Sequence, residues 1–139
     1  MSKLIRFGVS LDAALLKKFD TFIARLGYKS RSESLRDLIR ERLVALEWET
    51  GKTPTMGVLS LVYSHDVREL SKKLTDIQHH HLGIILSTTH IHMDEHNCLE
   101  VVILKGLGKE IQQVAGHLLS AKGVKHGKLI MTTTGSHLD

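Results

Sequence analysis

The sequence predicts an α+β protein of two modules, and three observations support this prediction. Apolar periodicity gives the element order strand, helix, helix in the first part and strand, helix, strand, strand, helix, strand in the second. Residues 49–55 hold the only proline, one glycine and three threonines, a composition typical of a linker. The excess positive charge is confined to the first part. Residues 1–53 hold 11 Lys and Arg against 7 Asp and Glu, whereas residues 54–139 hold 8 of each.

We therefore expect a first domain at 1–50, a linker at 51–56 and a second domain at 57–139. A domain of about 50 residues buries too small a fraction of its surface to be stable alone, so we expect a partner subunit. The basic first domain indicates a nucleic-acid surface. No apolar run approaches the roughly 20 residues of a membrane span, which favours a cytoplasmic protein without membrane contact, with the single Cys98 reduced.

Residues 4–11 are predicted to form a strand in which apolar side chains alternate with Arg6, Gly8 and Ser10. A lone strand leaves its hydrogen-bonding groups open, so we expect two copies to pair antiparallel in a dimer. The polar face of such a ribbon fits the major groove of double-stranded DNA. There Arg6 could pair with guanine and Ser10 could form one hydrogen bond, while Gly8 offers only its backbone.

Two helices are predicted to follow this strand. The first is capped by Ser10 or Asp12 and stops at Gly27, and the second begins at Ser30, which has the capping-box spacing to Glu33. The start of the second helix presents free N–H groups and a positive dipole end to a phosphate. The side chains suited to contact phosphate there are Lys29, Ser30 and Arg31.

The pattern of the first module alone also fits a strand and helical hairpin used only for dimerisation. Residues 6–11 and 27–37, however, resemble a ribbon-helix-helix repressor, in which a helix opening with Arg-Ser-Glu is common. This resemblance favours DNA binding.

The second module has the order β-α-β-β-α-β, which is the ferredoxin-like pattern. The predicted strands are 57–63, 83–93, 98–104 and 124–133, and the predicted helices are 66–80 and 109–121.

Histidines gather in this second module, where six of the ten lie between His79 and Cys98. His90 and His92 are two residues apart on a predicted strand and so share a face. A hairpin turn can bring Cys98 beside His92, and a fourth ligand could come from the histidines at the end of the preceding helix. We interpret His65, His117, His126 and His137 as solvated side chains, and His80, His81 and His96 as bystanders or weak secondary ligands.

One thiolate with several imidazoles suits zinc, copper or nickel. Tetrahedral placement would favour zinc and planar placement nickel or copper, and sequence spacing leaves both open. A metalloenzyme would need an open metal position and a nearby acid or base. Two further hypotheses are a metal store that does not bind DNA and a repressor whose second domain senses an amino acid.

The combined motifs resemble the NikR family of nickel-responsive regulators over nearly the whole chain. The residues that carry the resemblance are 78–81, 90–92, 94–100 and 123–129. The resemblance implies a regulator rather than an enzyme, in which nickel promotes binding to a palindromic operator and repression of nickel uptake genes. It also implies a homotetramer, with two ribbon-helix-helix dimers flanking four ferredoxin-like (ACT-like) domains.

The resemblance further implies one planar Ni²⁺ site per subunit, shared between subunits. Its ligands would be His90, His92 and Cys98 of one subunit and His79 of the neighbour, with Tyr63 and Glu100 orienting them. A potassium or similar cation at the domain interface would be held by Glu33 and Asp37. The sequence departs from some relatives at Gly8, where they use a side chain for base contact.

Overall fold

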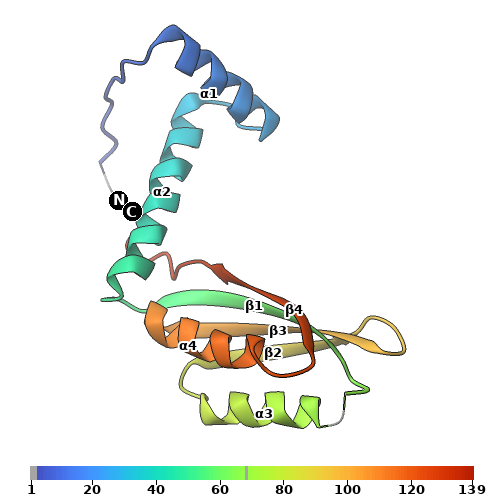
Figure 1. Ribbon diagram of the computed structural model, residues 1–139. Coiled ribbons are helices and arrows are strands. Elements are labelled where there is room, and N and C mark those ends of the chain that lie inside the picture. The colour runs from blue at the N-terminus through green and yellow to red at the C-terminus, as the bar shows by residue number, and fades with distance from the viewer. Residues whose placement is uncertain (1–2, 68) are drawn as a thin grey trace. The chain divides into compact units, whose positions relative to one another are not determined.

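The computed structural model describes residues 3–67 and 69–139. These residues form four helices and four strands, which confirms the predicted α+β class (Figure 1). The elements are α1 Ala13–Arg25, α2 Arg31–Thr50, β1 Thr55–Ser64, α3 Leu70–His80, β2 Ile85–His92, β3 Asn97–Gly106, α4 Gly108–Leu119 and β4 Val124–Met131. They divide into two compact units. One ends at Leu43 and also includes His137–Asp139, and the other is Val44–Ser136.

The first unit is a pair of helices whose ends follow the sequence signals. Asp12 caps α1, because its carboxylate accepts a hydrogen bond of 2.8 Å from the Leu15 backbone N–H. Gly27 lies just beyond α1 with φ +80°, a conformation that only glycine adopts readily. The hydroxyl of Ser30 accepts a bond of 3.2 Å from the Glu33 N–H and so caps the start of α2.

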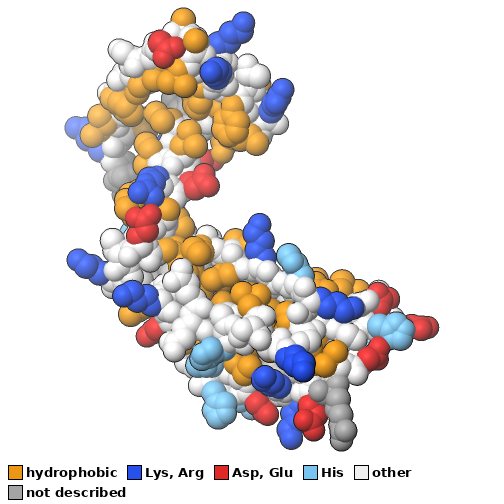
Figure 2. Space-filling model, viewed as in Figure 1, with side chains coloured by type: hydrophobic (Ala, Val, Ile, Leu, Met, Phe, Trp, Pro, Cys, Tyr) orange, Lys and Arg blue, Asp and Glu red, His pale blue; other side chains and the backbone are white. Residues whose placement is uncertain are grey.

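The strand predicted at 4–11 is not formed within the single chain. Residues 3–12 have neither helix nor strand, and their apolar side chains are exposed, from Leu4 at 82% to Leu11 at 45%. A strand needs a partner for its hydrogen bonds, and the described residues of one chain offer none here. Hydrophobic side chains also gather on the surface of this unit (Figure 2). The exposed ones from its helices include Leu15, Phe22, Leu26, Leu38, Ile39 and Leu43.

The second unit is an antiparallel sheet with strand order β2-β3-β1-β4, covered on one face by α3 and α4 (Figure 1). The predicted β-α-β-β-α-β order is therefore confirmed. The central strands β1 and β3 alternate between buried and half-buried residues, as expected for strands with one face on a core.

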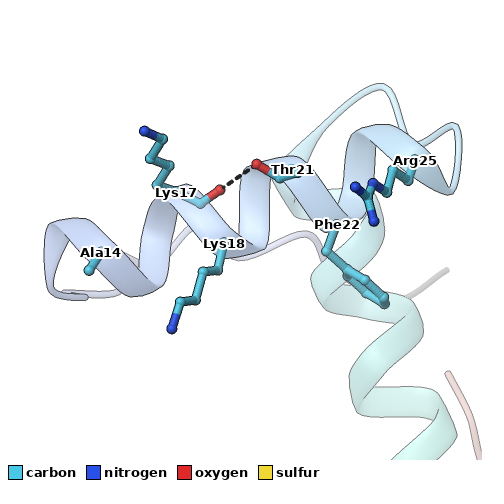
Figure 3. Close-up of a pocket in the computed structure, with 6 residues that line it drawn as sticks. All are labelled: Ala14, Lys17, Lys18, Thr21, Phe22 and Arg25. Atoms are coloured by element: carbon cyan, nitrogen blue, oxygen red, sulfur yellow. Dashed lines mark hydrogen bonds between the residues drawn. The ribbon is translucent and has the colours of Figure 1, made fainter.

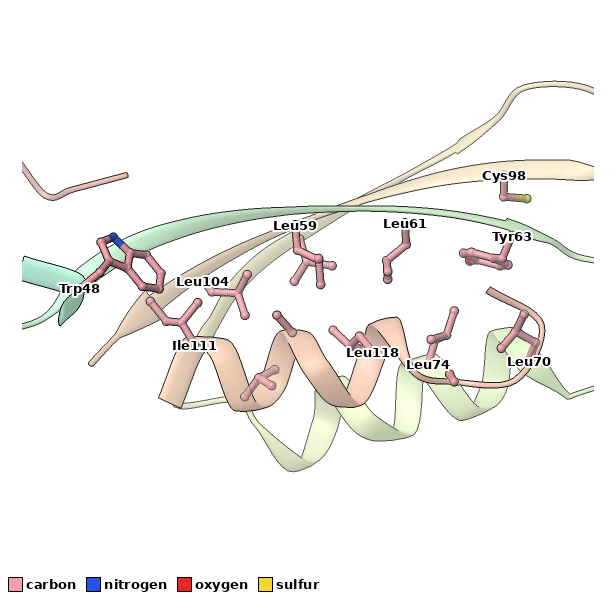
Figure 4. Packing of buried hydrophobic residues seen from close by; sticks show 14 residues of the cluster. Trp48, Leu59, Leu61, Tyr63, Leu70, Leu74, Cys98, Leu104, Ile111 and Leu118 are labelled. Atoms are coloured by element: carbon pink, nitrogen blue, oxygen red, sulfur yellow. The ribbon is translucent and has the colours of Figure 1, made fainter. Parts of the chain in front are cut away.

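The core lies between this sheet and the two helices. Figure 4 shows Trp48 at one end of the core and Tyr63 and Cys98 at the other. Trp48, from the end of α2, donates a 2.9 Å hydrogen bond from its indole N–H to the Thr132 carbonyl. Gly127 on β4 allows close packing, since a Cβ there would lie 2.8 Å from the Ser60 carbonyl oxygen. The end of the core that holds Cys98 is where the chemistry gathers.

The helix predicted to begin at residue 66 begins instead at Leu70. A turn precedes it, in which the Val67 N–H donates to the Ser64 carbonyl and the His65 N–H donates to the His96 carbonyl. Glu69 then has φ +64° and provides no side-chain cap. The turn therefore keeps His65 against the sheet instead of at the start of a helix.

Candidate metal centre

Cys98 lies on the helix-facing side of the sheet, in a row formed by three neighbouring strands. It pairs with His92 on β2 and with Tyr63 on β1, because β3 lies between those strands. Residues directly opposite on antiparallel strands share a face, so the three side chains project together. Cys98 is fully buried, whereas His92 on the edge strand is exposed. The row thus places a buried thiol beside an accessible imidazole.

Two imidazoles reach the sulfur of Cys98. Nδ1 of His92 lies 3.6 Å from Sγ, as the hairpin prediction required, and Nδ1 of His65 lies 3.2 Å from Sγ. The ligand atoms of His65, His92 and Cys98 all lie within 4.8 Å of one another. His65 was interpreted from sequence as a solvated side chain, and this interpretation was wrong. The available signal was its two-residue spacing from Tyr63 on a strand that neighbours β3.

His90 lies beside this cluster and is held by Tyr63. The rings of His90 and His92 have centroids 4.9 Å apart. The hydroxyl of Tyr63 lies 3.1 Å from Nδ1 of His90 and donates a bond of 3.1 Å to Glu100. A hydroxyl has one proton to donate, so Nδ1 of His90 must carry the proton in this arrangement. The lone pair on Nε2 of His90 is then available to a metal.

A hydrogen-bond chain continues from Glu100 into α3. The Gln78 amide donates to Glu100 at 2.9 Å and accepts from the Thr88 hydroxyl at 2.9 Å. Gln78 and Glu100 are both buried, so these bonds satisfy groups that water cannot reach. The residue after Gln78 is His79, which is exposed near the end of α3. The position of α3 is thereby tied to the residues that hold His90.

Burial shapes the electrostatics of the site. Burial raises the pKa of the Cys98 thiol above its ordinary value, and the carboxylates of Asp94, Glu100 and Asp66 raise it further. Burial likewise raises the pKa of Tyr63, with Glu100 adding to the effect, so Tyr63 keeps its proton. The apo site therefore favours a neutral thiol, and a metal must displace that proton to gain a thiolate.

The turn between β2 and β3 is fixed by Asp94. Its carboxylate accepts bonds from the Asn97 side chain and from the backbone N–H groups of His96 and Asn97, which lower the pKa of Asp94 to about 2. Lys125 donates to the Asn97 amide oxygen at 2.6 Å. A rigid turn of this kind keeps His92 and Cys98 opposite each other.

The remaining predicted ligands lie apart from the cluster. His79 and His80 are exposed on α3, and the rings of His81 and His117 have centroids 5.8 Å apart. His96 contacts the Asp66 carboxylate through Nδ1. Among residues 3–67 and 69–139, the one group of three or more potential ligand side chains that converges is His65, His92 and Cys98.

Comparison with known proteins places this site in a family. The description "NikR C terminal nickel binding domain" matches residues 56–132, and "Ribbon-helix-helix protein, copG family" matches residues 5–45. A protein from Geotalea uraniireducens is 54% identical over 138 residues, with 99% of each chain covered. The chain belongs to the NikR family. It is a nickel-responsive transcription regulator with a DNA-binding and a nickel-binding domain, and not an enzyme.

Other NikR relatives match over similar lengths. A protein from Thermococcus kodakarensis is 54% identical over 136 residues, covering 98% of this chain and 99% of its own. One from Pyrococcus abyssi is 52% identical over 135 residues, covering 97% and 98%. These two and the Geotalea protein are named nickel-responsive regulators. An uncharacterized protein from Thermotoga maritima, at 19% identity and a TM-score of 0.51 over 56% of this chain and 96% of its own, shares the fold alone.

The candidate DNA-contacting residues of this NikR chain have different surroundings. Arg6, Gly8, Ser10 and Lys29 are exposed. Arg31 forms two hydrogen bonds of 2.8 Å with Asp20, which joins α2 to α1. Lys17, Lys18 and Arg25 line an open hollow along α1 together with the half-exposed ring of Phe22 (Figure 3).

The two acids predicted to hold a second cation lie one turn apart on α2. Asp37 accepts a 2.8 Å bond from the Tyr28 hydroxyl and lies 3.7 Å from Arg40. This bond is the main cause that raises the pKa of Tyr28. Glu33 lies in the first turn of α2, where a negative charge suits the helix dipole. Within the described ranges, no helix is long and apolar enough to cross a membrane.

Proposed function

We propose that the chain binds one Ni²⁺ per subunit through His90, His92 and Cys98, with His79 of the partner subunit completing the set. The residues fit such an ion. A sulfur and an imidazole nitrogen lie 3.6 Å apart, and the Tyr63 bond leaves Nε2 of His90 free. Nickel would supply a planar, thiolate-bonding centre. The observation that carries the proposal is the row of His92 and Cys98 on paired strands, inside the region matched by the nickel-binding family.

The hydrogen bonds around Gln78 offer a route by which this set is coupled to α3. Gln78 contacts Glu100 on β3 and Thr88 on β2, and its neighbour is His79. The start of α3 lacks a side-chain cap and has Glu69 at a positive φ, which weakens the first turn. Ligation of His79 in the partner's site would hold the end of α3, and Gln78 would pass this constraint to the sheet.

At the other end of the chain we propose a dimer in which residues 4–11 of two subunits pair as an antiparallel ribbon. The exposed apolar side chains between Leu4 and Leu11, and those of Phe22 and Leu26, support this, because a ribbon and a second helix pair would cover them. Arg6 and Ser10 would then face the major groove of DNA. Two such dimers on four metal-binding domains would make a tetramer that binds a palindromic operator in the cytoplasm.

Nickel and operator must then strengthen each other's binding, because coupling between two ligands is reciprocal. The expected result is repression of nickel uptake genes when nickel is plentiful. A potassium ion held by Glu33 and Asp37 would support the DNA-bound arrangement. Its test is the dependence of operator binding on K⁺ in wild type and in Asp37→Asn.

The deciding experiment measures operator binding with and without nickel. DNA selected from random duplexes by the nickel-loaded protein provides the operator, and fluorescence anisotropy gives the Kd. We expect nickel to tighten binding by at least about 10-fold in wild type, the range of ordinary allosteric coupling, and to have no effect in Cys98→Ala. His137→Ala, a change at an exposed histidine outside the second unit, is the control and should behave as wild type. Equal operator affinity with and without nickel in wild type would overturn the proposal.

A further inference from the structure

The cluster of His65, His92 and Cys98, here called the inner triad, lies entirely within one subunit. Its nitrogen–sulfur distances are 3.2 and 3.6 Å. A tetrahedral zinc ion with ordinary bond lengths needs a nitrogen–sulfur separation of about 3.6 Å, and a planar ion with adjacent ligands needs about 3.1 Å. Because His65 is partly exposed and His92 is exposed, small rotations adjust both distances. The three ligand atoms are therefore preorganised around one point.

The surroundings of His65 favour ligation through Nδ1. Nδ1 is the atom that faces Cys98, while Nε2 lies 3.6 Å from the Asp66 carboxylate. A histidine ligand commonly directs its second nitrogen to a carboxylate, which fixes the tautomer and makes the ligand more basic. The backbone N–H of His65 also donates to the His96 carbonyl at 3.0 Å, which holds the turn against the hairpin. His65 thus has the orienting partner expected of a metal ligand.

We propose that the inner triad is a second metal site, selective for a zinc-class ion, which competes with nickel for His92 and Cys98. The chemistry follows from the donors. Two imidazoles and a thiolate with a solvent-filled fourth position suit a tetrahedral ion without geometric demands of its own. No residue of a partner subunit is needed. This inference rests on the proposed nickel set only in that the two share His92 and Cys98.

The consequence is that the two metals produce different assemblies. An ion in the inner triad occupies His92 and Cys98 but leaves His90 and the partner subunit's His79 without a metal. Such an ion does not link two subunits, so it does not constrain α3 of the neighbour. Zinc would therefore occupy the protein without producing the operator-binding state, and the geometry of one subunit would exclude a false signal.

The test compares zinc and nickel binding to the full-length tetramer with two variants, by competition against a chromophoric chelator. In His65→Ala we expect zinc affinity to fall by at least about 10-fold, since even a residue behind a ligand contributes 10- to 100-fold, and nickel affinity to stay within about twofold. In His79→Ala we expect the opposite pattern. Asp66→Asn should weaken zinc binding less than His65→Ala, and His126→Ala, an exposed histidine on β4, should change neither metal.

Co²⁺ used in place of Zn²⁺ gives an independent spectroscopic signature. A tetrahedral site with a thiolate ligand should give strong visible absorption in wild type, and His65→Ala should lose it. Unchanged zinc affinity in His65→Ala, or an equal loss of both metals in that variant, would overturn the inner triad. Unchanged nickel affinity in His79→Ala would instead contradict the shared nickel set and leave the zinc result standing.

Discussion

Removal of the Tyr63 hydroxyl should weaken nickel binding without removing any ligand. In Tyr63→Phe, His90 loses the group that holds Nδ1, and Glu100 loses one of its two hydrogen-bond donors. Loss of a residue that orients a metal ligand costs about 10- to 100-fold in affinity. A buried acceptor left short of a partner costs about 1–3 kcal/mol of folding free energy. Because Glu100 is buried and keeps its bond from Gln78, we expect the lower half of that range.

The assay is nickel competition together with urea unfolding of the apo protein at fixed subunit concentration. Tyr28→Phe is the matched control, since Tyr28 is the only other tyrosine and its hydroxyl bonds an exposed carboxylate in the first unit. The control should leave nickel affinity unchanged and alter stability by under about 1 kcal/mol. If Tyr63→Phe bound nickel as tightly as wild type, the hydroxyl would not orient His90, and the proposed tautomer of His90 would be wrong.

Three further predictions concern pH, packing and DNA. The pKa of Tyr63 is raised in the folded state, so its contribution to stability is complete below its ordinary pKa, about 10, and is lost as pH rises towards the raised value. Urea titrations should show the apo protein losing at most about 1.4 kcal/mol per pH unit from this group above that pH, and Tyr63→Phe should remove this slope. Gly127→Ala should cost about 1–3 kcal/mol in a thermal or urea melt, because the added Cβ overlaps Leu119, whereas Gly116→Ala, which meets nothing within 4 Å, should be neutral or stabilising. Lys29→Ala should weaken binding to all DNA sequences and lower the salt dependence, while Arg6→Ala should relax preference at one base position; anisotropy across salt and operator variants separates the two.

Local patterns predicted those parts of the structure that depend on neighbouring residues. The caps at Asp12 and Ser30 and the stop at Gly27 were visible because each acts within one turn of its helix. His92 and Cys98 were predicted to meet because a hairpin joins their strands. The start of α3 was predicted four residues early, since the backbone bond between His65 and His96 is a contact between distant segments.

The residues that the sequence did not reveal depend on contacts between elements or between chains. His65 reaches Cys98 because β1 pairs with β3 in a register that sets Tyr63 opposite Cys98, and no local pattern specifies that register. Tyr63 and Glu100 were predicted to orient the site only through family resemblance, and their roles as a bridge to His90 come from the structure. The strand at 4–11 depends on a second chain for its hydrogen bonds, so one chain leaves it irregular.

The burial of Cys98 decides which ions the centre can distinguish. A thiol whose pKa is raised by burial and nearby carboxylates gives up its proton only to an ion that bonds sulfur strongly, which excludes magnesium and calcium. Among the ions that remain, affinity alone discriminates poorly, so selectivity must come from geometry. Cys98 and His92 are common to both proposed sites, and the choice lies between His65 within the subunit and His90 with the partner subunit's His79. A tetrahedral ion is satisfied by the first choice and a planar ion requires the second, so coordination geometry determines whether two subunits become linked.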